Sequence, residues 1–132
     1  MAMTNPYQVY KNQSIMLAAP EELTLMLYNG CAKFIGQAEI SITNHDISQA
    51  NQFIQRAQAI LEELKVTLNM SYRVSEGLME LYQFMIRRLI DANIAKDVNV
   101  LKEVLDLVIE LRDTWAEAMR LTSQRSAISS RG

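Results

Sequence analysis

The sequence predicts an all-α protein, an antiparallel up-down-up-down four-helix bundle preceded by an extended N-terminal tail. Apolar residues recur three or four positions apart in four successive segments, as they do on the buried face of a helix. Both prolines, Pro6 and Pro20, lie near the N-terminus, so no proline interrupts the later segments. The links between segments are only a few residues long, and short links make neighbouring helices antiparallel.

Residues 1–19 form the predicted tail. Pro6 fixes its own φ and pushes Asn5 towards extended conformations, so the tail starts as a non-helical segment. Tyr7 and Tyr10 stand in it, although unfolded chain ends are usually poor in aromatic residues. We therefore expect this tail to dock, either onto its own bundle or onto a partner.

The first helix is predicted over residues 20–43. Pro20 suits its first position, and Glu21 and Glu22 complement the positive end of its dipole. Two apolar stripes follow, with Met26 between them. One stripe is Leu23, Leu27, Phe34, Ala38 and Ile42, and the other is Leu25, Tyr28, Ala32 and Ile35. Either the second stripe is a surface for a partner, or both stripes are core because a bundle helix contacts two neighbours.

The second helix is predicted over residues 46–68, with Asp46 as its N-cap. Its apolar residues keep a heptad spacing: Ile47, Ala50, Ile54, Ala57, Leu61, Leu64 and Leu68. The third helix is predicted over residues 72–94, with an apolar face of Val74, Leu78, Leu81, Met85 and Leu89.

The fourth helix is predicted over residues 97–121, with Asp97 as its cap. Its face is Leu101, Val104, Val108, Leu111, Trp115 and Ala118, and it is widened by Val100, Leu105, Leu107 and Ile109. Arg88 falls near the face of the third helix, where a charge needs a partner, and Asp113 is one candidate. Residues 122–132 turn to Ser, Arg and Gly, which predicts a flexible C-terminal tail.

Composition excludes several classes of function. A net charge of −2 with mixed signs argues against a nucleic-acid partner. The longest uncharged apolar run, residues 23–28, is far short of the roughly 20 residues that cross a bilayer, so no membrane insertion is expected. No signal peptide precedes it, and the single cysteine fits a reducing cytosol, so the predicted location is cytoplasmic.

Catalytic and metal-binding patterns are not found either. The single histidine, His45, falls in a helix link, and Cys31 is expected to be a small buried residue. One histidine and one cysteine make a zinc or di-iron site improbable, so neither a metal nor another cofactor is expected. No phosphate-binding glycine loop or nucleophile elbow occurs, so the protein is not expected to be an enzyme.

Four motifs together resemble the FliS family, the flagellar export chaperones for flagellin. They are NPYQVY at 5–10, APEELTLMLYNG at 19–30, LYQFMIRRLIDAN at 81–93 and LRDTW at 111–115. One departure is Ala19, where the family usually has a Ser or Thr cap, whose loss costs about 1 kcal/mol. The resemblance implies a mainly four-helix fold and a cytoplasmic, non-enzymatic role.

The resemblance also implies partners. Members hold the C-terminal segment of newly made flagellin, keep it from polymerising before export and help to present it to the export gate of the flagellar type III apparatus. Their N-terminal tail can cover the bundle's apolar surface, and its aromatic residues, here Tyr7 and Tyr10, are implicated in flagellin binding and gate docking. Some members also bind a second regulatory or co-chaperone protein.

Partner-binding residues are therefore expected in the tail and on the surplus apolar faces: Tyr7, Tyr10, Leu25, Met26, Tyr28, Ile35 and Leu107. Two other readings of the same surfaces remain open. One is a generic helical interaction or oligomerisation adaptor, and the other is an accessory subunit of an enzyme.

Overall fold

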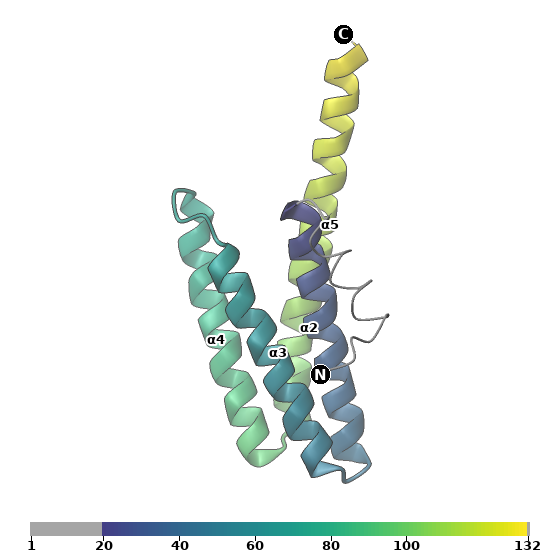
Figure 1. Ribbon diagram of the computed structural model, residues 1–132, viewed down its shortest axis with the longest axis vertical. Coiled ribbons are helices and arrows are strands. Elements are labelled where there is room, and N and C mark those ends of the chain that lie inside the picture. Colours follow the sequence, from purple (N-terminus) through teal and green to yellow (C-terminus); the bar gives the residue numbers. More distant parts are fainter. Residues whose placement is uncertain (1–19, 132) are drawn as a thin grey trace, which may run out of the picture.

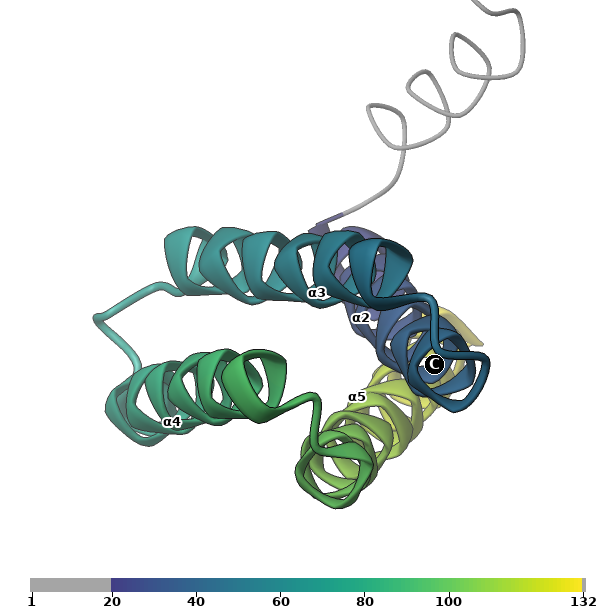
Figure 2. The same cartoon turned by 90° about the horizontal axis from the view of Figure 1, so that it is seen from below.

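The computed structural model describes residues 20–131, which form four helices and no strand. The helices are α2 (Pro20–Thr43), α3 (Ile47–Thr67), α4 (Arg73–Ala95) and α5 (Val98–Arg131). They run alternately up and down, and each packs against two others, in the order α2, α3, α4, α5 around the bundle (Figures 1 and 2). The predicted all-α, four-helix bundle is confirmed, while the tail lies outside the described residues.

The core follows most of the predicted seams. In α3 the heptad positions Ala50, Ile54, Ala57, Leu61 and Leu64 are all fully buried. From α5 the core takes Leu101, Val104 and Val108. Each large buried aliphatic side chain contributes roughly 1.5–3 kcal/mol by leaving water. The bundle is therefore held together by these seams, which fix which side of each helix faces inwards.

The links are short and capped by local hydrogen bonds. The Asp46 carboxylate accepts a hydrogen bond from the backbone N–H of Gln49 at 3.1 Å, as expected for an N-cap. The Asp97 carboxylate accepts bonds from Asn99 and Val100 at 2.9 and 3.3 Å. His45 and Lys96, which precede these caps, have left-handed backbone φ angles of 60° and 50°, so the chain reverses within a few residues after α2 and after α4.

The link between α3 and α4 is built differently, and it matters for the site. Tyr72, at the N-cap position of α4, makes no capping bond with its side chain. Instead the Ser75 hydroxyl reaches back to the carbonyl oxygen of Asn69 at 2.6 Å, and the Asn69 side chain accepts a bond from the Ser71 N–H at 3.0 Å. These bonds hold the link in place at the end of the bundle where α2 and α4 begin and α3 ends. We call this the open end of the bundle.

The structure corrects the predicted end of the last helix. We expected it at residue 121 with a flexible tail over 122–132, but α5 continues to Arg131. Neither Gly nor Pro occurs between these positions, and Ser and Arg are tolerated in a helix, so nothing in the sequence terminates it. As a result the last turns of α5 project beyond the other helices (Figure 1).

The partner expected for Arg88 was also wrong. Its guanidinium pairs with Glu103 of α5 at 3.0 Å and with Asp91 at 3.4 Å, while Asp113 pairs with its neighbour Arg112. The Arg88 side chain is half-buried and not part of the core, so its guanidinium can form an ion pair with a residue on the nearest turn of α5. The pair still joins α4 to α5, as a register-fixing contact would.

Candidate functional site

The open end of the bundle carries a groove, which we call the inner groove. It lies where the start of α2, the end of α3, the α3–α4 link, the start of α4 and Trp115 of α5 come together. Its cavity has a volume of about 230 Å³. The lining residues are Glu21, Thr24, Tyr28, Thr67, Leu68, Asn69, Tyr72, Val74, Ser75, Leu78, Tyr82 and Trp115.

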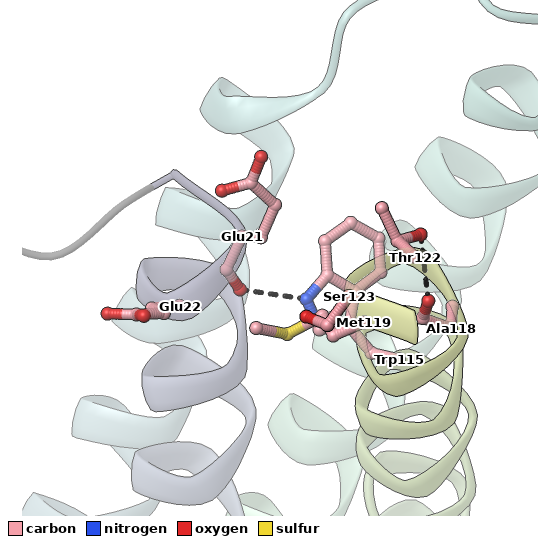
Figure 3. A pocket seen from close by; sticks show the side chains of 7 residues that line it. All are labelled: Glu21, Glu22, Trp115, Ala118, Met119, Thr122 and Ser123. Atoms are coloured by element: carbon pink, nitrogen blue, oxygen red, sulfur yellow. Dashed lines mark hydrogen bonds between the residues drawn. The ribbon is translucent and has the colours of Figure 1, made fainter. Parts of the chain in front are cut away.

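Helix α5 contributes Trp115 as one wall of the inner groove. Its indole N–H donates a hydrogen bond of 2.8 Å to the backbone carbonyl of Glu21, in the first turn of α2 (Figure 3). This satisfies the indole, which prefers a partner when it is partly buried. The bond also ties the start of the described chain to its last helix and holds the ring between two hollows.

Two tyrosine hydroxyls lie at the floor of the inner groove. Tyr28 of α2 and Tyr82 of α4 are each 2% exposed, and their hydroxyl oxygens are 2.5 Å apart. Burial raises the pKa of Tyr28, and the hydrogen bond with Tyr82 offsets part of that rise. Burial and the hydrogen bond with Tyr28 both raise the pKa of Tyr82. Both hydroxyl groups therefore stay protonated at physiological pH, and their hydrogen bond links α2 to α4 inside the core.

The second hollow, the outer pocket, lies between α2 and the projecting part of α5 and has a volume of about 490 Å³ (Figure 3). It is lined by Glu21, Glu22, Trp115, Ala118, Met119, Thr122 and Ser123. Trp115 and Glu21 thus belong to both hollows. Because they share these two residues, the inner groove and the outer pocket adjoin each other across the open end, with the Trp115 indole between them.

Apolar side chains on the rim of the inner groove are exposed to solvent. Tyr72 is 64% and Val74 66% exposed, while Leu78 is half-buried deeper in the groove. We had assigned Val74 to the buried face of its helix, but the first turn of α4 turns Ser75 inwards instead, where its hydroxyl bonds the Asn69 carbonyl, and this leaves Val74 on the outside. Such an apolar rim is typical of a surface that a partner covers.

The structure shows where the described members of the predicted partner-binding set lie. Tyr28 is 2% and Ile35 0% exposed, so both belong to the core, and Tyr28 also lines the floor of the inner groove. Leu25 and Leu107 are half-buried, and Met26 is 38% exposed. Tyr7 and Tyr10 lie outside the described residues. Of the five that are described, only Tyr28 lines either hollow, so the site is not assembled from this set.

Sequence reasoning missed most of the residues that form the site. Leu68 and Leu78 were assigned to helix faces, and Met119 was not singled out. A signal did exist, because Met70, Tyr72 and Val74 are large apolar residues at a link, where polar turn residues are usual. Large apolar residues at a link indicate that the link lies over an apolar surface.

Cysteine chemistry, metal ligands and membrane spans can be checked in the part of the chain that the structure describes. Cys31 is buried, and burial raises the pKa of its thiol to about 12, so it is not a thiolate at neutral pH. Within residues 20–131 no group of three or more metal-ligating side chains comes together. No helix in the same part of the chain is long and apolar enough to cross a membrane.

An all-helical bundle with an apolar groove at one end is typical of proteins that bind a helical or extended segment of another chain. The comparisons with known proteins agree with that class. A family model described as flagellar protein FliS matches residues 3–122. The chain therefore belongs to the FliS family, as the four motifs implied.

Individual relatives cover nearly the whole chain. It is 44% identical over 120 residues to the flagellar secretion chaperone FliS of Bacillus subtilis (strain 168), spanning 91% of this chain and 90% of that protein. Identity is 32% over 113 residues to the protein of the same name from Campylobacter jejuni, spanning 84% and 88% of the two chains. It is 28% over 113 residues, spanning 83% and 84%, for that of Salmonella typhimurium. The family is one of chaperones and not of enzymes, and membership supports a role in flagellar export.

Proposed function

We propose that this protein is a cytoplasmic export chaperone that binds the C-terminal segment of flagellin. By holding that segment it prevents premature polymerisation and aids delivery to the flagellar type III export apparatus. The observation that carries the proposal is the apolar inner groove, found in a chain whose relatives are named flagellar secretion chaperones.

The energetics favour an amphipathic client. A segment that is disordered when free loses conformational entropy when it binds, and burial of apolar surface has to offset that loss. Exposed side chains on the rim, such as Tyr72 and Val74, supply such surface at roughly 25 cal/mol per Å² before the costs of association. The half-buried Leu78 and Trp115 offer contacts deeper in the groove.

The N-terminal tail is part of the proposal. Residue 19 precedes the first turn of α2, and Glu21 in that turn lines both hollows, so the tail joins the bundle beside the groove. In the free protein these residues cover the groove and compete with the client, and once displaced they dock at the export gate. Deleting residues 1–18 should then tighten client binding. If affinity collapses instead, the tail is a direct contact.

Calorimetry with a peptide of the flagellin C-terminus tests the central claim. We expect sub-micromolar binding with a large negative heat-capacity change, the signature of coupled folding. The variant Val74→Asp should weaken binding, because it puts a charge on the rim. Ile40→Asp is the matched control, since Ile40 is similarly exposed, at 63% against 66%, but lines neither hollow.

The outcomes separate the alternatives. No binding by the unmodified protein would sink the chaperone proposal. Equal binding of unrelated amphipathic peptides would favour a generic helical adaptor. If the flagellin peptide binds and both aspartate variants behave alike, the client is held somewhere other than the inner groove.

A further inference from the structure

The two sides of Trp115 differ in chemistry. The inner groove is walled by apolar and neutral polar side chains, with Glu21 at its edge. The outer pocket is lined by Glu21 and Glu22 from the first turn of α2 and, from α5, by the indole of Trp115 and the thioether of Met119. In Figure 3 the Glu21 side chain extends beyond its helix turn on the side of α2 that faces α5, while the Glu22 side chain points away from α5.

Two acidic groups of α5 close to Trp115 in the sequence already have cationic partners. Glu117 pairs with Arg120 at 2.6 Å, and Asp113 pairs with Arg112 at 3.1 Å. Among the described residues no Lys or Arg pairs with Glu21 or Glu22. Their position in the first turn of α2 favours the helix dipole, but that role needs no aromatic wall and no hollow.

We propose that the outer pocket is a subsite for a lysine or arginine side chain carried by the apolar client segment. The inference rests on the proposed function and adds a chemical requirement to it. A carboxylate beside an aromatic face is the combination that binds a cation, through an ion pair and a cation–π contact. The aliphatic stem of the same side chain packs on Met119 and Ala118, as long cationic side chains do on apolar surface.

The subsite also fixes the direction in which the client lies. Apolar residues of the segment face Leu78 and Val74 in the inner groove, and the basic residue reaches past Trp115 to Glu21. A segment bound in the opposite direction would bring its cation to the neutral wall formed by Thr67 and Leu68, where no carboxylate meets it. The acidic side of the pocket therefore selects both the composition and the orientation of the client.

The test uses the full-length protein and a synthetic peptide of the flagellin C-terminus, titrated by calorimetry at low and high salt. Glu21→Gln should weaken binding about three- to tenfold at low salt, as expected for one partly exposed ion pair with a cation–π contact. Glu22→Gln should have a smaller effect, and the double variant should lose most of the salt dependence. Glu63→Gln, an equal change of charge at an exposed site on α3 outside both hollows, is the control.

Peptides in which each basic residue is replaced in turn by Gln complete a double-mutant cycle. One of them should bind the unmodified protein more weakly, yet bind Glu21→Gln no worse than the parent peptide does. Circular dichroism should show that the variants keep their helix content.

Three results would overturn the inference. If both glutamine variants bind the parent peptide as the unmodified protein does, the pocket does not select a cation, although the chaperone proposal stands. If the variants bind more tightly and Lys11→Gln reproduces the gain, the pocket serves the chain's own tail. If the unmodified protein does not bind the peptide at all, the proposed function fails first.

Discussion

The hydroxyl groups of Tyr28 and Tyr82 meet at 2.5 Å in the core and link two helices, α2 and α4, that lie across the bundle from each other. Their rings are tilted by 50° with centroids 6.5 Å apart, so the contact is through the hydroxyls more than through stacking. The pair supports the floor of the inner groove and joins the two halves of the bundle there.

Replacing either tyrosine by phenylalanine should destabilise the protein. Each single variant leaves the other hydroxyl buried without a partner, at a cost of about 1–2 kcal/mol. The double variant removes both polar groups and should be no less stable than either single variant. Urea unfolding measures all three, with Tyr72→Phe, at a 64% exposed site, as the control. Additive losses in the double variant would contradict the coupling.

Stability should fall at alkaline pH. Burial raises the pKa of Cys31 from its ordinary value of 9.0 to about 12, so the unfolded chain loses this proton first. The contribution is complete below pH 9.0 and is lost as pH rises towards about 12, by up to about 1.4 kcal/mol per pH unit. The raised pKa values of Tyr28 and Tyr82 add a further loss above pH 10.0.

Urea unfolding of the unmodified protein and of Cys31→Ala, followed between pH 8 and 10, separates these groups. The variant should lose little stability between the ordinary pKa values of cysteine, 9.0, and tyrosine, 10.0. A slope identical to that of the unmodified protein would show that Cys31 is not the group responsible.

Two helical glycines in α2 should respond differently to alanine. A Cβ at Gly36 would meet nothing within 4 Å, so Gly36→Ala should stabilise the protein by about 0.5–1 kcal/mol through backbone entropy. A Cβ at Gly30 would lie 3.2 Å from the Cδ1 of Ile60, so that side chain must shift and the gain should be smaller. Thermal unfolding compares the two. A larger gain at position 30 would contradict the packing described between α2 and α3.

Trp115 is the single tryptophan of the chain and should report on the client directly. Binding of the flagellin peptide in the groove should shift its fluorescence to shorter wavelength and protect it from acrylamide quenching. Trp115→Phe removes the bond to the Glu21 carbonyl and should weaken binding while the bundle stays folded. If calorimetry detects binding but the fluorescence does not change, the client does not touch this end of the bundle.

Much of the fold could be predicted because it depends on local patterns. The heptad of α3 and the caps Asp46 and Asp97 each follow from a few neighbouring residues. Both caps appear as expected, and the heptad is buried except at its two ends, where Ile47 is 50% exposed and Leu68 is half-buried. The end of α5 could not be found in the same way. Polar residues at 122–131 lower the propensity for helix without forbidding it, and no terminating residue stands before Gly132.

The site was predicted less well than the fold. Both stripes of α2 satisfy the helical period, and periodicity alone does not tell which residues of each the neighbouring helices will cover. In the structure Tyr28 and Ile35 of one stripe and Ala38 of the other are core residues. The groove depends instead on where helices of unequal length stop, and so on contacts between residues as distant as Glu21 and Trp115.

That distance has a consequence for the order of synthesis. The ribosome makes the chain from its N-terminus, and the two residues that close the groove are 94 positions apart. Helices α2, α3 and α4 can emerge and begin to pack before the indole wall exists. A nascent or prematurely truncated chain that ends before Trp115 therefore has exposed apolar faces but no groove. On the proposed function, a client cannot be captured in this groove until Trp115 has been translated.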